Sequence, residues 1–218
     1  MPNFAEGISL AALWDAWRAA SPLAQDVQFV LAALVLVGGL VFVRKLTLLL
    51  WRGYTDSRFA EKFFSHPDLQ QANDNLRMEP TPASRVFVAG LIEWNFWKKR
   101  GGDDPSMLNL RWQNVSHAMR FQVDVEVAEM RRWLALVSIG CWLAPLLGVV
   151  GTAGDAIALL AAGNAAAADW AGALVSLFAG ALAGSAFLVA HAILARSVER
   201  FDERLTVALE RFVSWAYR

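Results

Sequence analysis

Ala144-Pro145-Leu146-Leu147-Gly148-Val149-Val150-Gly151-Thr152-Ala153-Gly154-Asp155 is a polar stretch inside an apolar run, 133–160, that is long enough to cross a bilayer as a helix. A charged carboxylate at the centre of such a helix costs at least about 2.5–3.5 kcal/mol unless it faces protein or water. Asp155 and Thr152 therefore mark a candidate functional site. They predict a membrane protein that moves ions, or a partner of one.

The composition supports a membrane location. The chain has 218 residues, of which 56% are hydrophobic and ten are tryptophans, whereas soluble domains are usually about 45–50% apolar. Two further runs, 27–51 and 171–195, can also span a bilayer. Only the connection 161–170 separates the last two runs, so they must form an antiparallel hairpin. A single cysteine, Cys141, excludes a disulfide framework.

The distribution of basic residues predicts the orientation of the chain. Of the 20 Lys and Arg residues, 14 lie within 44–132 and five within 196–218. The positive-inside rule then places 1–26 outside, 52–132 inside, 161–170 outside and 196–218 inside. Arg44-Lys45 follows the first apolar run where a cleavage pattern would be needed, so we interpret that run as an uncleaved anchor and not as a signal peptide.

The inside segments are predicted to be long helical extensions of the spans. Clusters of Gly, Asn and Pro predict breaks at 70–84 and 100–106. After Pro105 the apolar pattern continues without a stop, which predicts one helix running into the second span. Residues 196–218 should continue the third span as an amphipathic helix. The predicted fold is an all-α integral membrane protein with three transmembrane helices and long cytoplasmic helical extensions.

Small and polar residues share one face in each helix of the hairpin. In the second span they are Ser138, Cys141, Pro145, Gly148, Thr152 and Asp155, and in the third Ala173, Ser176, Gly180, Gly184, Phe187 and His191. For Gly180 and Gly184 we expect close helix packing. Thr152 either lines a path or bonds the carbonyl of its own helix. Asp155 is either a working acid or a hydrated residue at the outer mouth.

No catalytic constellation can be assembled from this sequence, so an enzyme is not expected. His191 has the position of a histidine that snorkels at the inner interface, and His66 and His117 lack partners at metal-ligand spacing. We therefore expect no metal and no other cofactor.

The stretch Ala144-Pro145-x-x-Gly148-x-x-Gly151-Thr152 resembles the Ser-Pro-x-x-Gly-Leu-x-Gly-Thr motif of the MotA/TolQ/ExbB family of proton-channel subunits. Weaker similarities are Met119-Arg120 with its following acids and Gly180-x-x-Ala183. The order of segments is also similar over nearly the whole chain, most closely to the TolQ branch. The resemblance implies a bacterial inner-membrane protein with a periplasmic N-terminus and a cytoplasmic C-terminus.

In that family several copies, usually a pentamer, surround a single-span TolR/ExbD-type partner whose helix carries an essential aspartate. By this resemblance, the pore-lining or proton-path residues are Pro145, Gly148, Gly151 and Thr152, with Thr152 as a hydroxyl facing the partner helix. The implied partners are protons, the lipid bilayer, further copies of the chain and the single-span protein, but no nucleic acid.

The third span departs from the family pattern. Gly172 and Leu177 stand where the family usually has a glutamate and a threonine, and Ala186 stands at the usual proline. Counting from Asn164, Thr152 and Ser176 should lie at similar depth. We hypothesise that Asp155 supplies the missing carboxylate from the second helix of the hairpin and that Ser176 supplies the missing hydroxyl.

The expected function is that of a TolQ-like stator, which uses the proton-motive force for envelope work such as envelope integrity or cell division. One alternative is an ExbB-like energiser of outer-membrane import. Another is a membrane scaffold that has kept the fold and lost the proton path.

Overall fold

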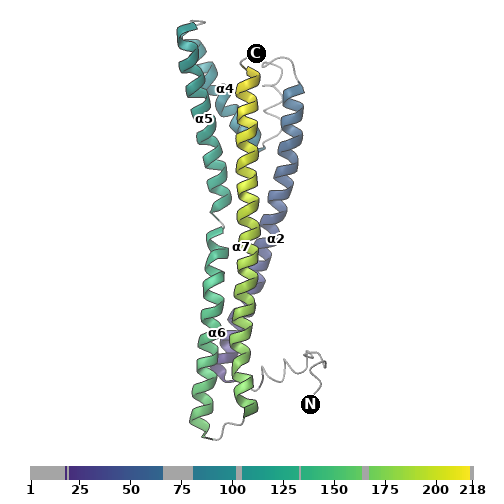
Figure 1. Ribbon diagram of the computed structural model, residues 1–218, viewed down its shortest axis with the longest axis vertical. Coiled ribbons are helices and arrows are strands. Elements are labelled where there is room, and N and C mark those ends of the chain that lie inside the picture. Colours follow the sequence, from purple (N-terminus) through teal and green to yellow (C-terminus); the bar gives the residue numbers. More distant parts are fainter. Residues whose placement is uncertain are drawn as a thin grey trace. The chain divides into compact units, whose positions relative to one another are not determined.

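The computed structural model describes Arg18 and residues 20–65, 81–101, 105–132, 134–163 and 167–216. Within these ranges the elements are all helices: α2 (Pro22–Ser65), α4 (Pro82–Gly101), α5 (Pro105–Arg131), α6 (Leu134–Ala162) and α7 (Ala167–Ala216) (Figure 1). Three helices are long and apolar enough to cross a membrane. The predicted all-α membrane fold with three spanning helices is confirmed. Where the bilayer boundaries fall along these helices stays a prediction.

Two helices begin at a hydroxyl residue followed by proline. Ser21 Oγ accepts a hydrogen bond from the Ala24 N–H (3.3 Å) at the start of α2. Thr81 and Ser84 cap α4 reciprocally, because each backbone N–H donates to the other's hydroxyl oxygen. Proline at the first helical position loses no intrahelical bond there, so these sequences define helix starts locally.

The junction between α5 and α6 lies partly outside the described residues. The sequence predicts one continuous helix after Pro105, and the structure describes it in two stretches, α5 ending at Arg131 and α6 beginning at Leu134. Arg132 forms a turn, and Trp133 lies outside the described residues. The Arg132 N–H still donates a hydrogen bond to the Ala128 carbonyl oxygen at 3.0 Å, four residues earlier as in a helix. The continuous helix therefore stays a prediction at Trp133.

Other predicted features match the helix bounds only in part. The predicted break at 70–84 falls mostly on residues outside the described ranges, as do most of the segment 1–26, His66 and Asn164. α4 begins at Pro82, inside that predicted break. Gly163 follows the end of α6 with φ of +72°, a left-handed conformation that glycine adopts readily after a helix.

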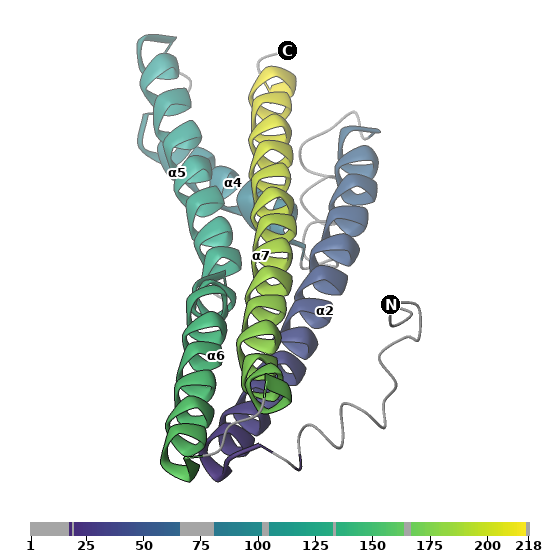
Figure 2. The ribbon, with the colours of Figure 1, turned by 60° about the horizontal axis from the view of Figure 1, so that its bottom comes forward.

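The chain divides into two compact units. Unit 1 comprises Met1–Phe42 and Ala135–Ala192, and unit 2 comprises Val43–Leu134 and Ile193–Arg218. In unit 1, α6 and the first half of α7 run side by side in both views (Figures 1 and 2). The large side chains exposed on these helices are apolar, including Trp142, Leu146, Phe178 and Leu182. An apolar exterior of this kind suits helices surrounded by lipid.

Unit 2 has a core of phenylalanine rings and an ion pair. Phe87 has no exposed surface, and its ring centroid lies 4.8 Å from that of Phe63 and 5.1 Å from that of Phe212. Arg85 binds the nearly fully buried Glu126 through two nitrogens, Nε at 2.8 Å and Nη2 at 2.9 Å. This bidentate pair joins α4 to α5.

Candidate functional site

Glycines bring α6 and α7 into backbone contact in unit 1. A Cβ atom on Gly180 would lie 2.7 Å from the Ala144 carbonyl oxygen and from Gly148 Cα. A Cβ on Gly184 would lie 2.6 Å from Pro145 Cγ. A side chain at either position would collide with the opposite helix, so both glycines set the distance between the two helices.

The Phe187 ring occupies the space beside two further glycines. A Cβ on Gly38 of α2 would collide with Phe187 Cε1, and one on Gly140 of α6 would lie 2.8 Å from Cδ1. Phe187 itself is buried. The ring therefore packs α7 against both α2 and α6.

Thr152 lies one turn beyond Gly148 and is half-buried. Its hydroxyl donates a hydrogen bond to the Gly148 carbonyl oxygen at 3.0 Å. That bond satisfies the hydroxyl proton within α6. The oxygen keeps further acceptor capacity on a side chain that retains exposed surface in the single chain.

Asp155 lies one turn further along α6, and only 5% of its surface is exposed. Its Oδ1 accepts a hydrogen bond from the Ser21 N–H at 2.8 Å, at the start of α2. Its Oδ2 is also buried and has no hydrogen-bond partner within the described residues. The carboxyl group thus joins α6 to the N-terminus of α2 and keeps one oxygen unpaired.

Ser176 is completely buried within the protomer. Its hydroxyl oxygen accepts a hydrogen bond from Gln28 Nε2 of α2 at 3.0 Å. The same side chain lies against Gly151, where an added Cβ would be 2.9 Å from Ser176 Cβ. Ser176 therefore sits at the level of the Gly151-Thr152 pair, but it faces α2 and α6.

Gln28 is a polar residue that the sequence reasoning missed. The sequence analysis treats the first span only as an apolar run, in which an uncharged amide does not stand out. The signal was a glutamine in the first two turns of an apolar helix, where a polar side chain usually seeks a partner on another helix. Which partner it seeks could not be inferred from α2 alone.

The predicted site residues thus lie in one region without sharing one surface. Gly148, Gly151, Asp155 and Ser176 are buried between helices, whereas Thr152 and Pro145 are half-buried. Gly172 and Leu177 are also half-buried. Within the described residues no group of His, Cys, Asp or Glu is placed to hold a metal ion.

Comparison with known proteins supplies the family. No curated protein matches the chain significantly. A family profile described as the MotA/TolQ/ExbB proton channel family does match, over residues 80–206. The matched region includes α4, α5, α6 and the larger part of α7, and with them the Ala144–Thr152 motif and the glycine contacts described above. Since this match covers more than half of the chain, the protein belongs to the MotA/TolQ/ExbB proton channel family.

Proposed function

We propose that the chain is a TolQ-like stator subunit of the bacterial inner membrane, with its N-terminus in the periplasm and its C-terminus in the cytoplasm. Several copies, a pentamer by analogy with the family, would enclose the single helix of a TolR/ExbD-type partner. The observation that carries the proposal is Thr152: it lies in the family-matched region, and its side chain keeps exposed surface, unlike the buried Asp155 one turn further along α6.

Proton transport requires a site at which a carboxyl group can bind and release a proton. An ionised aspartate on a partner helix is costly in the bilayer, and its protonation removes that cost. A hydroxyl that still accepts a hydrogen bond, as at Thr152, can bind the protonated carboxyl group. Repeated binding and release of protons would then favour successive positions of the partner helix and drive envelope work.

Asp155 and Ser176 form the outer part of the proposed path. The unpartnered Oδ2 of Asp155 is the atom at which a proton would bind. Ser176 is farther from any pore surface, because it is enclosed by the protomer and held by Gln28. A path through Ser176 would therefore run between helices of one subunit.

The same geometry also supports a second candidate, the non-conducting scaffold. Gly172 and Leu177 carry neither the carboxylate nor the hydroxyl that the family usually places on this span. In the scaffold, Asp155 acts only as an acceptor for the Ser21 N–H and stabilises the start of α2.

A pair of Asp155 variants separates the two candidates. Asp155→Asn keeps an oxygen that can accept the Ser21 N–H but cannot ionise, whereas Asp155→Ala removes the acceptor. If Asp155 carries protons, both variants should abolish complementation of a stator-deficient strain and proton uptake into vesicles containing the partner. If Asp155 is only a helix cap, the Asn variant should behave as wild type and the Ala variant should be less stable.

Thr152 is tested in the same assays with Thr152→Ser and Thr152→Val. The serine keeps the hydroxyl and should retain activity, whereas the nearly isosteric valine should lose it at normal membrane abundance. If the Thr152→Val protein takes up protons at the wild-type rate, Thr152 does not have a pore-facing role. An ExbB-like unit would show the same responses, and the client encoded by a neighbouring gene, Pal-like or receptor-like, would distinguish it.

A further inference from the structure

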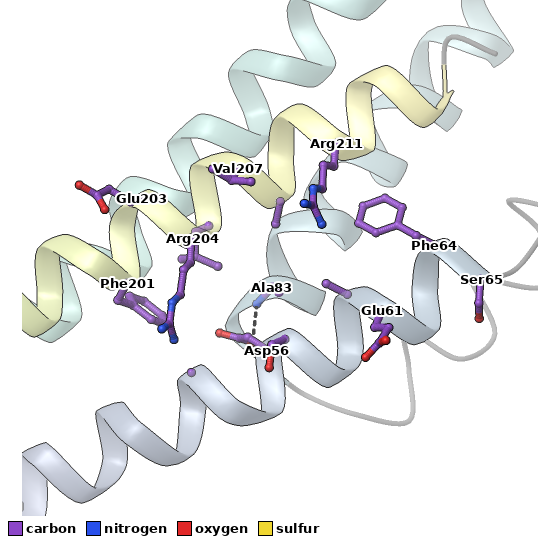
Figure 3. Close-up of a pocket in the computed structure, with 15 residues that line it drawn as sticks. Asp56, Glu61, Phe64, Ser65, Ala83, Phe201, Glu203, Arg204, Val207 and Arg211 are labelled. Atoms are coloured by element: carbon purple, nitrogen blue, oxygen red, sulfur yellow. Dashed lines mark hydrogen bonds between the residues drawn. The ribbon is translucent and has the colours of Figure 1, made fainter.

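Unit 2 contains a long groove between α2 and α7. It has a volume of about 960 Å³ and is lined on the α2 side from Gly53 to Ser65 and on the α7 side from Phe201 to Arg211. Figure 3 shows Arg204 and Arg211 extending from α7 toward α2, and Asp56 bonded to the backbone of Ala83. At about 1.5 Å per residue, each wall covers several helical turns.

The groove combines an apolar floor with walls of opposite charge. Ala60, Phe64, Val207 and Ala208 contribute the apolar surface. Asp56 and Glu61 lie on the α2 wall, whereas the α7 wall has Arg204, Arg211 and one acid, Glu203, and so keeps a net positive charge. In the described part of the chain no ion pair joins either arginine to an acid across the groove. Such a surface suits an amphipathic helix that carries its own charges.

The outward face of α5 has the matching properties. Phe121 is 65% exposed and Val125 is 44% exposed, and they lie one turn apart. Asp124 is exposed beside them. The opposite face of α5, with Val115, Met119 and Val123, is buried in unit 2. The exposed face is therefore an apolar ridge with an acid at its edge, and the described residues of its own unit do not cover it.

The levels of the two surfaces also agree. Arg131 of α5 and Asp202 of α7 form an ion pair at 3.8 Å, which places them at the same height in the protomer. Val125 lies six residues before Arg131, and Ala208 lies six residues after Asp202. Rotation about an axis along the helices preserves height, so Val125 of one copy and Ala208 of the next would meet at one level in a ring.

We propose that this groove is the docking site for α5 of a second copy of the chain. Phe121 and Val125 fill the apolar floor, and Asp124 faces Arg211. The contact is heterologous, since the groove of each copy receives the ridge of the next, and such contacts form a ring when the rotation between copies closes. The inference rests on the proposed homo-oligomer and specifies the cytoplasmic interface that holds it together.

Cysteine cross-linking of the full chain in membranes tests the docking site. In a Cys141→Ser background, Val125→Cys combined with Ala208→Cys should give a ladder of disulfide-linked oligomers after mild oxidation. Each single cysteine should remain monomeric or stop at a dimer. The matched control combines Ala208→Cys with Ile92→Cys, because Ile92 is 63% exposed on α4 and lies outside the proposed contact.

The mass of the detergent-solubilised wild-type complex separates the two levels of the proposal. The docking site is wrong if the mass is multimeric but the Val125/Ala208 pair gives no ladder. It is also wrong if the Ile92/Ala208 pair gives an equal ladder. In both cases the proposed oligomer would still stand. A monomeric mass in detergent and in native nanodiscs would overturn both.

A charge exchange tests the register of the contact. Asp124→Arg and Arg211→Asp should each lower the cross-linked fraction about twofold or more, the scale of a rim ion pair replaced by like charges. Combining the two restores opposite charges and should restore cross-linking. If the double variant cross-links no better than the single ones, Asp124 and Arg211 do not face each other and the proposed register is wrong.

Discussion

Unit 1 and unit 2 hold their helices together in opposite ways. In unit 1 the closest approach is between glycines, with Gly148 and Gly180 in backbone contact. In unit 2 the core is made of large rings grouped around Phe87, together with the Arg85–Glu126 pair. Within one chain, small residues pack the unit with the apolar exterior and large residues pack the other.

The difference is the one expected when lipid surrounds unit 1 and water surrounds unit 2. In lipid, apolar side chains gain little by moving inside, so helices associate through close van der Waals contact and a few hydrogen bonds. In water, burying aromatic surface is itself the main driving force. The packing of unit 1 therefore fits the predicted bilayer location, and that of unit 2 fits the predicted aqueous extensions.

Both units nevertheless use a carboxylate from one helix to bind the start of another. Asp155 accepts from the Ser21 N–H at the start of α2, and Asp56 accepts from the Ala83 N–H at the start of α4, at 3.1 Å. Each acid is buried and keeps one oxygen without a partner within the described residues. The unpaired N–H groups and dipole of a helix start favour such an acceptor in either solvent.

The largest expected effect is in the core of unit 2. Phe87→Ala should lower the free energy of unfolding by about 3–5 kcal/mol, as expected for a buried phenylalanine truncated to alanine. Chemical denaturation of the purified full chain in detergent measures it, with Ile92→Ala as an exposed control. A loss no larger than that of the control would mean that unit 2 does not depend on its aromatic core.

The second effect is in unit 1, where the substitution adds side-chain volume to a helix contact instead of removing it. Gly180→Ala adds a methyl group against backbone and should cost about 1–3 kcal/mol. Gly39→Ala is the matched control, because a Cβ on Gly39 meets nothing within 4 Å. Thermal unfolding followed by circular dichroism compares the two. Equal stability of both variants would show that close glycine contact does not hold unit 1.

A third prediction concerns Asp56. Asp56→Ala removes the acceptor for the Ala83 N–H and should cost about 1 kcal/mol, as for loss of a helix cap. Asp56→Asn keeps an acceptor oxygen and should cost less. Hydrogen exchange at the start of α4 checks the assignment. Unchanged exchange in the Ala variant would contradict the capping role.

The stability of the wild type should depend on pH, because burial raises the pKa of Asp56 above its ordinary value of 3.8. The folded state therefore holds this proton more tightly than the unfolded state. The resulting stabilisation is fully present below pH 3.8 and is lost as the pH rises through the raised pKa. Wild type should lose stability relative to Asp56→Asn over that interval. Parallel stability curves would contradict the shift.

The smallest expected effect is the Gln28–Ser176 hydrogen bond. A double-mutant cycle with Gln28→Leu and Ser176→Ala should give a coupling energy of about 0.6 kcal/mol, the average for hydrogen bonds between membrane helices. Steric trapping of the protein in bicelles is sensitive enough to measure it. A coupling near zero would leave close packing alone to hold Ser176 in place.

Much of the fold could be predicted from runs and periodicity. The apolar runs and the basic residues beyond them predicted three spanning helices, and the short 161–170 connection predicted the hairpin. The predicted continuity from α5 into α6 stays a prediction, because Trp133 lies outside the described residues. Thr152 was identified correctly as a residue that could bond its own helix, since that bond depends only on residues one turn apart.

The partners of the candidate site could not be predicted for a different reason. A helical face of small and polar residues looks the same whether it packs on a neighbour or lines a pore. Ser176 shares such a face with Gly180, yet it is enclosed by Gln28 from a helix far away in sequence. Asp155 is bonded to Ser21, which lies 134 residues earlier.

The sequence by itself determined the family, the helical class, the three spanning segments and the Ala144–Thr152 motif, because each depends on residues close together along the chain. Only the tertiary structure decided that Asp155 holds the start of α2, that Gln28 encloses Ser176, and that Thr152 keeps exposed surface. Those outcomes depend on which helix faces which, and the periodicity of a single helix contains no information about its neighbours.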